Sequence, residues 1–125
     1  MTGAVTELAA ALVAAINSRD PFELEPLLDP EVEIVTGRSV HAGPAAAVAW
    51  AGKEYDNLVR RYAVDELRER DGRVLALGCV QYVWREEGEV ADSSPIALEL
   101  EFSGERLRRL RLHDDAAAAL SSFAG

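Results

Sequence analysis

Residues 96–113 read IALELEFSGERLRRLRLH, and this stretch decides the fold. Apolar and charged side chains alternate along both halves, which is the period-two pattern of two half-buried β-strands. A loop at residues 104–106 gives a hairpin in which leucine meets leucine on one face and glutamate meets arginine on the other. The predicted pairs are Leu100 with Leu110, Leu98 with Leu112, Glu101 with Arg109, and Glu99 with Arg111. A one-residue slip would set leucine against arginine, so we predict this register although it leaves Phe102 opposite Arg108.

The pattern extends upstream of this hairpin. Alternation over residues 59–70 and 73–85 predicts two more strands, joined by a tight turn at Asp71-Gly72. The two strands of the hairpin cover residues 94–102 and 107–113. The sequence therefore predicts four long antiparallel strands in succession.

Helices are predicted before and after these strands. Apolar residues at steps of three and four place a first helix over residues 2–18, and Asp20-Pro21-Phe22-Glu23 is a helix-start signal for a short second one. Asp29-Pro30 is expected to end that second helix. A first strand follows at residues 32–36, a turn region at 37–43, and a third helix from Pro44 to about Asn57, with Ala47 and Trp50 on its buried side. Asp115 is expected to cap a short last helix whose Leu120 and Phe123 pack back on the body.

Composition limits the possible functions. The chain has 125 residues, 49% of them hydrophobic, and a net charge of −9, which is typical of a single globular domain over residues 1–125. The acidic balance argues against binding to nucleic acid and to an anionic membrane surface. Cys79 is the single cysteine, so no internal disulfide and no thiolate zinc site is expected. We expect a cytoplasmic protein without metal, cofactor, signal peptide or membrane-spanning segment.

The order of elements, two helices, a strand, a third helix and four antiparallel strands, resembles the NTF2-like superfamily. It looks most like the SnoaL-like branch, which includes polyketide cyclases and ketosteroid isomerases. The resemblance implies an α+β cone, with a curved antiparallel sheet wrapped around the N-terminal helices and the third helix and a short C-terminal helix. It spans almost the whole chain and rests on four short motifs: Asp20-Pro21, Asp29-Pro30-Glu31-Val32-Glu33, Val40-His41-Ala42-Gly43 and Leu112-His113-Asp114-Asp115.

The resemblance also locates the positions where ketosteroid isomerases hold a tyrosine and two aspartates. Those positions correspond here to Leu12, Thr36 and Leu98. None of these side chains accepts a proton at neutral pH, and the two leucines offer no hydrogen-bond donor to an oxyanion. Isomerase chemistry of that type is therefore not expected.

Three other residues are catalytic candidates. Asp65 faces Gly78 if the turn at residues 71 and 72 is tight, and Asp114 continues the inward alternation of the last strand. His41 lies near the expected pocket mouth, whereas His113 is expected on the outer face. Each has a structural alternative: a solvent-exposed rim for Asp65, capping of the last helix for Asp114, and a surface histidine for His41.

The expected pocket wall is mostly apolar and suits a small apolar molecule held mainly by buried area. The predicted ligand-binding residues are Leu12, Ile16, Thr36, Trp50, Val80, Tyr82, Leu98, Leu110 and Leu112. The alternative is that these side chains simply fill the cone as core. The opposite face of the strand at residues 73–85 is also apolar and needs cover, which predicts a homodimer through the sheet.

These observations leave three functions open. The first is a small-molecule-binding domain that lacks the isomerase acids. The second is an isomerase, cyclase or hydrolase that acts on an apolar cyclic substrate with Asp65 or Asp114 as acid or base. The third is a protein-interaction module that uses the sheet.

Overall fold

The computed structural model describes residues 4–55 and 57–124. The helices are α1 (Ala4–Ser18), α2 (Pro21–Leu24), α3 (Pro44–Ala51) and α4 (Ala116–Ala124), and a 3-10 turn, η1 (Glu25–Leu27), follows α2. The strands are β1 (Leu28–Val35), β2 (Val40–Ala42), β3 (Glu54–Tyr55), β4 (Leu58–Arg70), β5 (Arg73–Trp84), β6 (Val90–Ser103) and β7 (Arg106–His113). The predicted order of elements is confirmed. The start predicted for the first helix lies outside the described residues.

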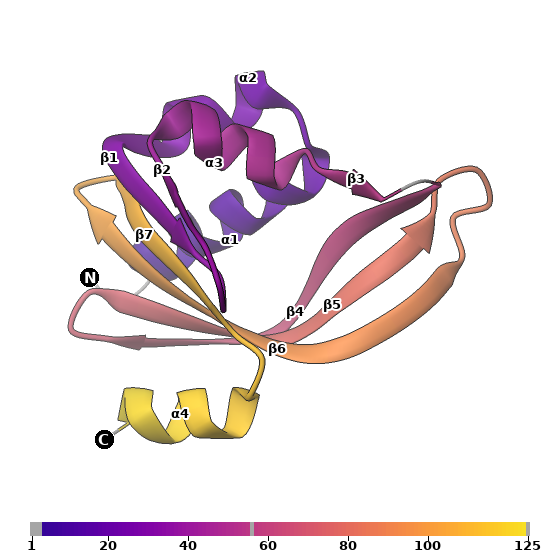
Figure 1. Ribbon diagram of the computed structural model, residues 1–125. Coiled ribbons are helices and arrows are strands. Elements are labelled where there is room, and N and C mark those ends of the chain that lie inside the picture. Colours follow the sequence, from indigo (N-terminus) through magenta and orange to yellow (C-terminus); the bar gives the residue numbers. More distant parts are fainter. Residues whose placement is uncertain (1–3, 56, 125) are drawn as a thin grey trace.

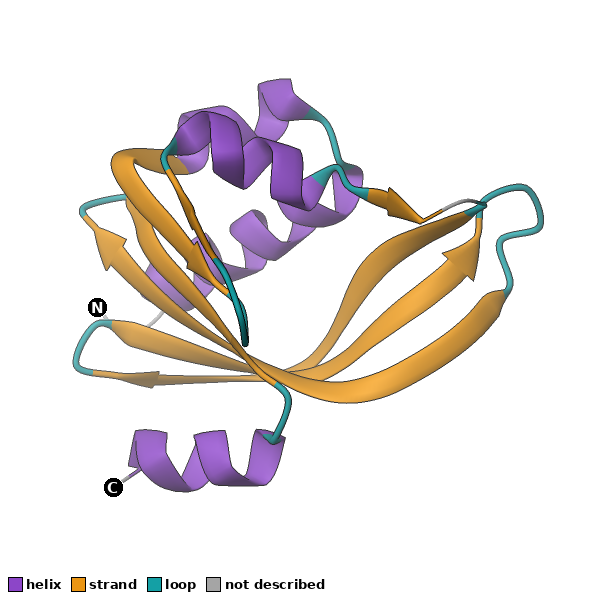
Figure 2. Cartoon of the chain, in the orientation of Figure 1, coloured by secondary structure: helices purple, strands orange, loops and turns teal. Residues whose placement is uncertain are grey.

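Within the described residues, the strands form one seven-stranded sheet in the order β2-β1-β7-β6-β5-β4-β3. Strands β4 to β7 are antiparallel neighbours as predicted, but β1 pairs parallel with β7, so the sheet is mixed. These two strands are far apart in sequence, and no hairpin fixes their relative direction. The sheet curves around α1 and α3, while α4 lies on the convex side (Figures 1 and 2). This is the α+β cone that the sequence predicts.

The N-terminal segment forms its short helix as predicted but becomes extended earlier than expected. The Asp20 side chain accepts a hydrogen bond from the Phe22 amide at 2.9 Å, and Pro21 takes the first helical position. The stop predicted at residues 29 and 30 is wrong, because these residues lie inside β1. Pro30 has no amide hydrogen to donate to a neighbouring strand. Because the pairing of β1 with β7 is interrupted between Leu28 and Glu33, no ladder hydrogen bond is lost there.

Two predicted boundaries around α3 are also corrected. The region predicted as a turn contains β2, which pairs antiparallel with β1. Helix α3 ends at Ala51 rather than near Asn57, with Gly52 as its C-cap residue, and the chain then enters β3. Ala47 and Trp50 are buried on this helix, as predicted.

The hairpin of β6 and β7 has all four predicted pairs of leucines and of opposite charges. The loop, however, is the two-residue turn at positions 104 and 105, and Ser103 pairs with Arg106. Phe102 faces Leu107, so the predicted contact with Arg108 is wrong. Arg108 is the extra residue of a β-bulge, which absorbs the one-residue difference in loop length and leaves the rest of the register unchanged.

A second bulge bends β4 against β5. The tight turn at positions 71 and 72 is confirmed, and both residues have positive φ. Asp65 does not face Gly78 as predicted, because Val64 takes that place and Asp65 is the extra residue. A Cβ on Gly78 would lie 2.0 Å from the Ala63 carbonyl oxygen. Glycine is therefore required where the bulged strand approaches its neighbour.

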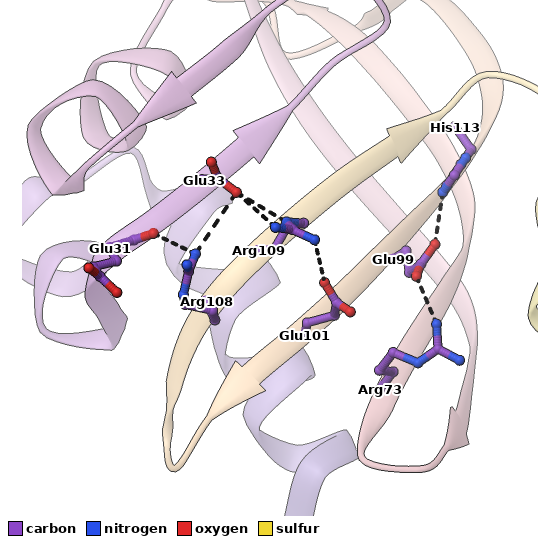
Figure 3. A network of polar contacts seen from close by, with 8 residues as sticks. All are labelled: Glu31, Glu33, Arg73, Glu99, Glu101, Arg108, Arg109 and His113. Atoms are coloured by element: carbon purple, nitrogen blue, oxygen red, sulfur yellow. Dashed lines mark hydrogen bonds and ion pairs between the residues drawn. The ribbon is translucent and has the colours of Figure 1, made fainter.

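The convex face of the sheet carries a charged region and an apolar region. Arg109 bridges Glu33 on β1 and Glu101 on β6, at 3.0 and 3.5 Å (Figure 3). Glu99 contacts Arg73 on β5 and His113 on β7 in the same way, at 3.2 and 3.1 Å (Figure 3). The basic run of β7 therefore supplies cross-strand partners, and His113 is on the outer face as predicted.

Helix α4 covers the apolar region of this face. Leu75 and Ala97 are fully buried beneath it, and they form one cluster with Ala119 and Phe123 of the helix, which are each 7% exposed. Asp115 caps the helix by accepting from the Ala118 amide at 3.0 Å, as predicted. Part of the apolar convex surface that suggested a second copy is thus covered by the chain itself.

Candidate functional site

The inner end of the cone is packed core. Its side chains include five of the predicted pocket-wall residues, all at most 9% exposed: Leu12, Ile16, Val80, Leu98 and Leu110. Among the described residues, no polar or charged residue is buried in this core. Leu12 and Leu98, at the positions that correspond to isomerase acids, are each 1% exposed and sealed against other hydrocarbon.

Four other predicted residues come together at the mouth of the cone. A cavity of about 660 Å³ opens there between β1, β2, α3, β4 and β7. The described residues that line it are Thr36, Ser39, His41, Ala46, Ala49, Trp50, Lys53, Arg60 and Leu112. Thr36, Trp50 and Leu112 were predicted as ligand-binding residues and His41 as a catalytic candidate, so the structure brings these four predictions into one site.

One wall of the cavity is the hairpin between β1 and β2. The Thr36 amide donates to the Ser39 carbonyl at 2.9 Å, and the Ser39 amide donates to the Thr36 hydroxyl oxygen at 3.2 Å. These bonds hold the tip in a tight turn. His41 is half-buried on β2 and pairs with Ile34, whose side chain faces the core, so its imidazole is on the inner side.

The opposite wall is organised around Arg60. Its guanidinium lies 4.5 Å from the ring centre of Trp50 and 5.5 Å from that of Tyr62, and it donates through Nη2 to the Trp50 carbonyl oxygen at 2.8 Å. That carbonyl is at the C-terminal end of α3, where the helix favours a positive charge. Two aromatic rings and one charge-assisted hydrogen bond therefore fix the cation at the cavity.

The row of side chains beside Arg60 extends across the concave face. Tyr82 on β5 is directly opposite Arg60, and Asp92 on β6 is opposite Tyr82. The predicted inward direction of Tyr82 is confirmed, since the next pair in the same register joins Tyr62 with Val80, both in the core. Tyr82 is half-buried and packs at the edge of the core rather than among the residues that line the cavity.

Asp65 lies at a different place. It is exposed and lines a groove of about 470 Å³ between α1 and β4, together with Val13, Asn17 and Val64. Beside this groove the Asn17 side chain makes two hydrogen bonds to the backbone of Tyr62, accepting from the amide at 2.8 Å and donating to the carbonyl at 2.9 Å. The Asn17 amide thus continues the hydrogen-bond ladder at the edge of β4.

Asp114 is exposed at the bend between β7 and α4, whereas Asp115 caps the helix. The three catalytic candidates are therefore dispersed: His41 at the mouth, Asp65 in the α1–β4 groove, and Asp114 at the surface.

Among the described residues, no three His, Cys, Asp or Glu side chains come together in a way that could hold a metal ion. No described helix is long and apolar enough to cross a membrane.

Sequence reasoning missed Ser39, Lys53 and Arg60 as cavity residues. A signal for Arg60 was present, because it is two residues from Tyr62 in a strand and therefore shares its face. Lys53 was placed inside a helix that actually ends before it. Ser39 lies in the region predicted as a turn, which contains the β1–β2 hairpin.

The chain matches no model of a known protein family, and no curated protein matches it significantly. Solved structures do resemble it. A SnoaL-like polyketide cyclase candidate from Shewanella putrefaciens CN-32 superposes with a TM-score of 0.75 at 11% identity, over 96% of each chain. An NTF2-like protein of unknown function from Burkholderia pseudomallei K96243 gives 0.73 at 18% identity, over 94% of this chain and 95% of that one.

A third structure contains a ligand. A Catenulispora acidiphila protein with a ketosteroid isomerase-like fold, in complex with trimethylamine, has a TM-score of 0.72 at 14% identity, over 86% of this chain and 84% of that one. At such identities these likenesses show the fold. The chain has the NTF2-like fold of SnoaL-like and ketosteroid isomerase-like proteins.

Proposed function

We propose that this domain binds a small organic molecule in the mouth cavity and does not carry out ketosteroid isomerase chemistry. The observation that carries the proposal is the cavity itself. Its volume of about 660 Å³ is in the range of pockets for small molecules, and Trp50 and Leu112 provide apolar contact area within it. Thr36, Ser39 and His41 add polar groups that would orient the bound molecule.

The side chains at the isomerase positions support binding rather than catalysis. Leu12 and Leu98 are buried leucines, and Thr36 is a weak acid and base at neutral pH. Acid–base catalysis needs a proton acceptor within hydrogen-bond reach of the reacting atom. Asp65 and Asp114 are on other parts of the surface and line none of this cavity.

Fluorescence of Trp50 tests the proposal, because this ring lines the cavity. The chain has two tryptophans, so a Trp84→Phe background leaves Trp50 as the single emitter. We expect a panel of cyclohexane derivatives with neutral, anionic and cationic head groups to contain at least one compound that changes Trp50 emission and raises Tm.

A filled cavity provides the control. Ala49→Phe introduces a ring from α3 into the lining and should abolish the response, whereas Ala45→Phe, at an exposed position of α3 outside the lining, should retain it. A panel without any effect at millimolar concentration, or an effect that survives in Ala49→Phe, would contradict the proposal.

The second candidate function is an enzyme that uses Asp65. A carboxylate at a groove lined by apolar groups of α1, such as Val13, favours it. If a turnover assay on an apolar cyclic substrate finds activity, Asp65→Asn should lower kcat by about a hundredfold. Full activity in that variant would exclude Asp65 as the acid or base.

We also propose that a second copy covers the part of the convex face that α4 leaves open. The row Ala63, Cys79 and Pro95 crosses β4, β5 and β6 there, and Pro95 is exposed. Size-exclusion chromatography with light scattering should give the dimer mass, and Cys79→Arg should give the monomer mass. A monomer for the unmodified chain at micromolar concentration would refute this part of the proposal. A cytoplasmic location stays a prediction from the composition.

A further inference from the structure

We propose that the groove between α1 and β4 binds an extended, cationic segment of a partner protein, which adds to the sheet as a strand along the outer edge of β4. This inference goes beyond the proposed function, because it concerns a different surface and a different class of ligand. It rests on the open edge of β4, on the apolar groove beside that edge, and on the negative charge around the groove.

The outer edge of β4 is open beyond its first residues. Strand β3 pairs with Leu58 and Val59, at one end of the 13-residue strand (Figure 1). Further along, the Asn17 side chain takes the place of a strand by bonding both the amide and the carbonyl of Tyr62. Within the described residues, no backbone group of another segment bonds this edge beyond Tyr62. The backbone N–H and C=O groups of such an edge are a template for a further strand.

The bonds at Tyr62 show which way the open groups point. Both backbone groups of Tyr62 are directed away from β5, so those of Val64, two residues further on, have the same direction. Along the groove, α1 rises about 10.5 Å from Ala10 to Asn17. This is the length of about three residues of an extended strand. The groove therefore matches a short extended segment.

The groove beside this edge is largely apolar. The described residues that line its volume of about 470 Å³ are Ala10, Val13, Ala14, Asn17, Val64, Asp65, Glu66 and Leu67. The two alanines of α1 are exposed and leave room beside the strand, while Val64 and Leu67 pack against the main core. In strand addition the main chain gives affinity and alternate side chains enter pockets, so the side chains that face this groove should be apolar.

Three exposed carboxylates surround the groove. Asp65 lines it, and Glu69 follows Leu67 by two residues, on the same face of β4. Glu7 precedes Ala10 by one turn of α1 and so shares its side of the helix. Among the described residues, no cation forms an ion pair with any of these three carboxylates.

These charges favour a cationic occupant. Arg68, the single basic residue of positions 64–69, is on the opposite face of β4 from Leu67 and pairs with Glu66. The net charge of −9 attracts cationic partners in the same way at longer range. A second copy of this edge would bring its own Asp65 and Glu69 against like charges, which destabilises strand pairing. A segment with apolar residues and lysine or arginine at alternate positions avoids this repulsion.

Three heptapeptides of alternating valine with lysine, glutamine or glutamate test the inference, because they share one apolar face and differ in charge. Fluorescence polarisation of the labelled peptides with the full chain measures the affinities. We expect the valine–lysine peptide to bind at least tenfold more tightly than the valine–glutamine peptide, and the valine–glutamate peptide not to bind. Added NaCl should weaken binding of the valine–lysine peptide.

A methylated peptide separates strand addition from charge attraction alone. N-methylation of every amide in the valine–lysine peptide keeps its charge and removes its backbone donors. We expect this peptide to bind at least tenfold more weakly than the unmodified one. Hydrogen exchange at the Val64 amide should slow when the unmodified peptide is bound, because this amide then gains a carbonyl partner.

Two matched pairs of variants assign binding to the groove. Ala14→Arg places a positive charge in the lining and should lower affinity for the valine–lysine peptide tenfold or more. Ala11→Arg adds the same charge at an exposed position of α1 outside the lining and should change affinity less than threefold. Asp65→Lys should also abolish tight binding, whereas Glu87→Lys, at the turn after β5, should retain it. Thermal unfolding checks that each variant is folded.

Each alternative has its own outcome. Equal affinity for the three peptides, tight binding of the methylated peptide, or equal losses in Ala14→Arg and Ala11→Arg would overturn the inference. So would the absence of binding at millimolar valine–lysine peptide, or a loss of dimer mass in Ala14→Arg, which would assign the groove to a second copy. Trp50 emission reports the mouth cavity separately, so failure of this inference leaves the proposed function standing, and the reverse also holds.

Discussion

At both ends of the concave face the strand alternation directs side chains inward, but one end is packed core and the other end is the mouth cavity. Leu98 and Leu112 are direct cross-strand partners on β6 and β7, and both point inward. Leu98 is 1% exposed because it is in the main core with side chains of α1, such as Leu12. Leu112 is half-buried and lines the mouth cavity with Trp50 and Arg60.

The difference shows that the position of a residue relative to the helices, rather than its side-chain type, decides whether it packs in the core or lines the cavity. Helix α1 fills the inner end, whereas α3 ends at Ala51 and leaves the cone open beyond it. Two adjacent leucines with the same inward direction therefore differ in role. Substitutions at the two ends should differ accordingly in their effect on stability.

The largest contrast is expected between Leu98→Asp and Leu112→Asp. A carboxylate at position 98 would be buried in hydrocarbon, which should lower the free energy of unfolding by about 4 kcal/mol or more. At position 112 the carboxylate can reach water at the mouth, so a loss of about 1 kcal/mol is expected. Chemical denaturation of both variants measures the difference, and equal losses would refute the distinction between the two ends.

The next effect concerns the bulge that bends β4 against β5. In Gly78→Ala the new methyl would lie 2.0 Å from the Ala63 carbonyl oxygen, so the strands must separate. We expect a loss of about 2–3 kcal/mol from this overpacking. Gly37→Ala is the control, because nothing lies within 4 Å of its added Cβ, and its unfolding midpoint should hardly change. A neutral Gly78→Ala would mean that the bulge relaxes freely.

Much of the fold was predictable because it follows from local periodicity. The register of the β6–β7 hairpin was correct because a slip would have set leucine against arginine over four pairs. The bulges at Asp65 and Arg108 were not predicted, although each leaves a step of three between neighbouring core-facing residues, from Val64 to Leu67 and from Leu107 to Leu110. The parallel pairing of β1 with β7 depends on contacts between distant segments, which periodicity does not encode.

The candidate site was predictable in part for the same reason. Thr36, His41, Trp50 and Leu112 were found through motifs and alternation, and the structure brings them to one cavity. The same alternation could not tell these residues from the packed core at Leu98. The cationic wall was missed because its meaning comes from Arg60 meeting the end of α3, a contact between elements that no short motif describes.

A smaller effect is expected where α1 joins the edge of β4. Asn17→Ala removes two hydrogen bonds to the Tyr62 backbone and should lower the free energy of unfolding by about 1–2 kcal/mol. Asn17→Asp retains the acceptor and loses the donor, so its loss should be intermediate. Hydrogen exchange should speed up at the Tyr62 amide in Asn17→Ala; unchanged protection there would show that the side chain does not secure the edge.

The smallest effect is expected on the convex face, in the ion pairs of Arg109 with Glu33 and Glu101. These side chains are about one-third exposed, with N–O distances of 3.0 and 3.5 Å. Partly solvated pairs of this kind contribute little, so Arg109→Met should cost less than about 1 kcal/mol. The loss should shrink in 1 M NaCl, because the Debye length falls to about 3 Å. A large loss that persists in high salt would mean that this charged face contributes as much to stability as the packed core does. The contrast between sealed and solvent-exposed regions would then no longer explain the energetics of the sheet.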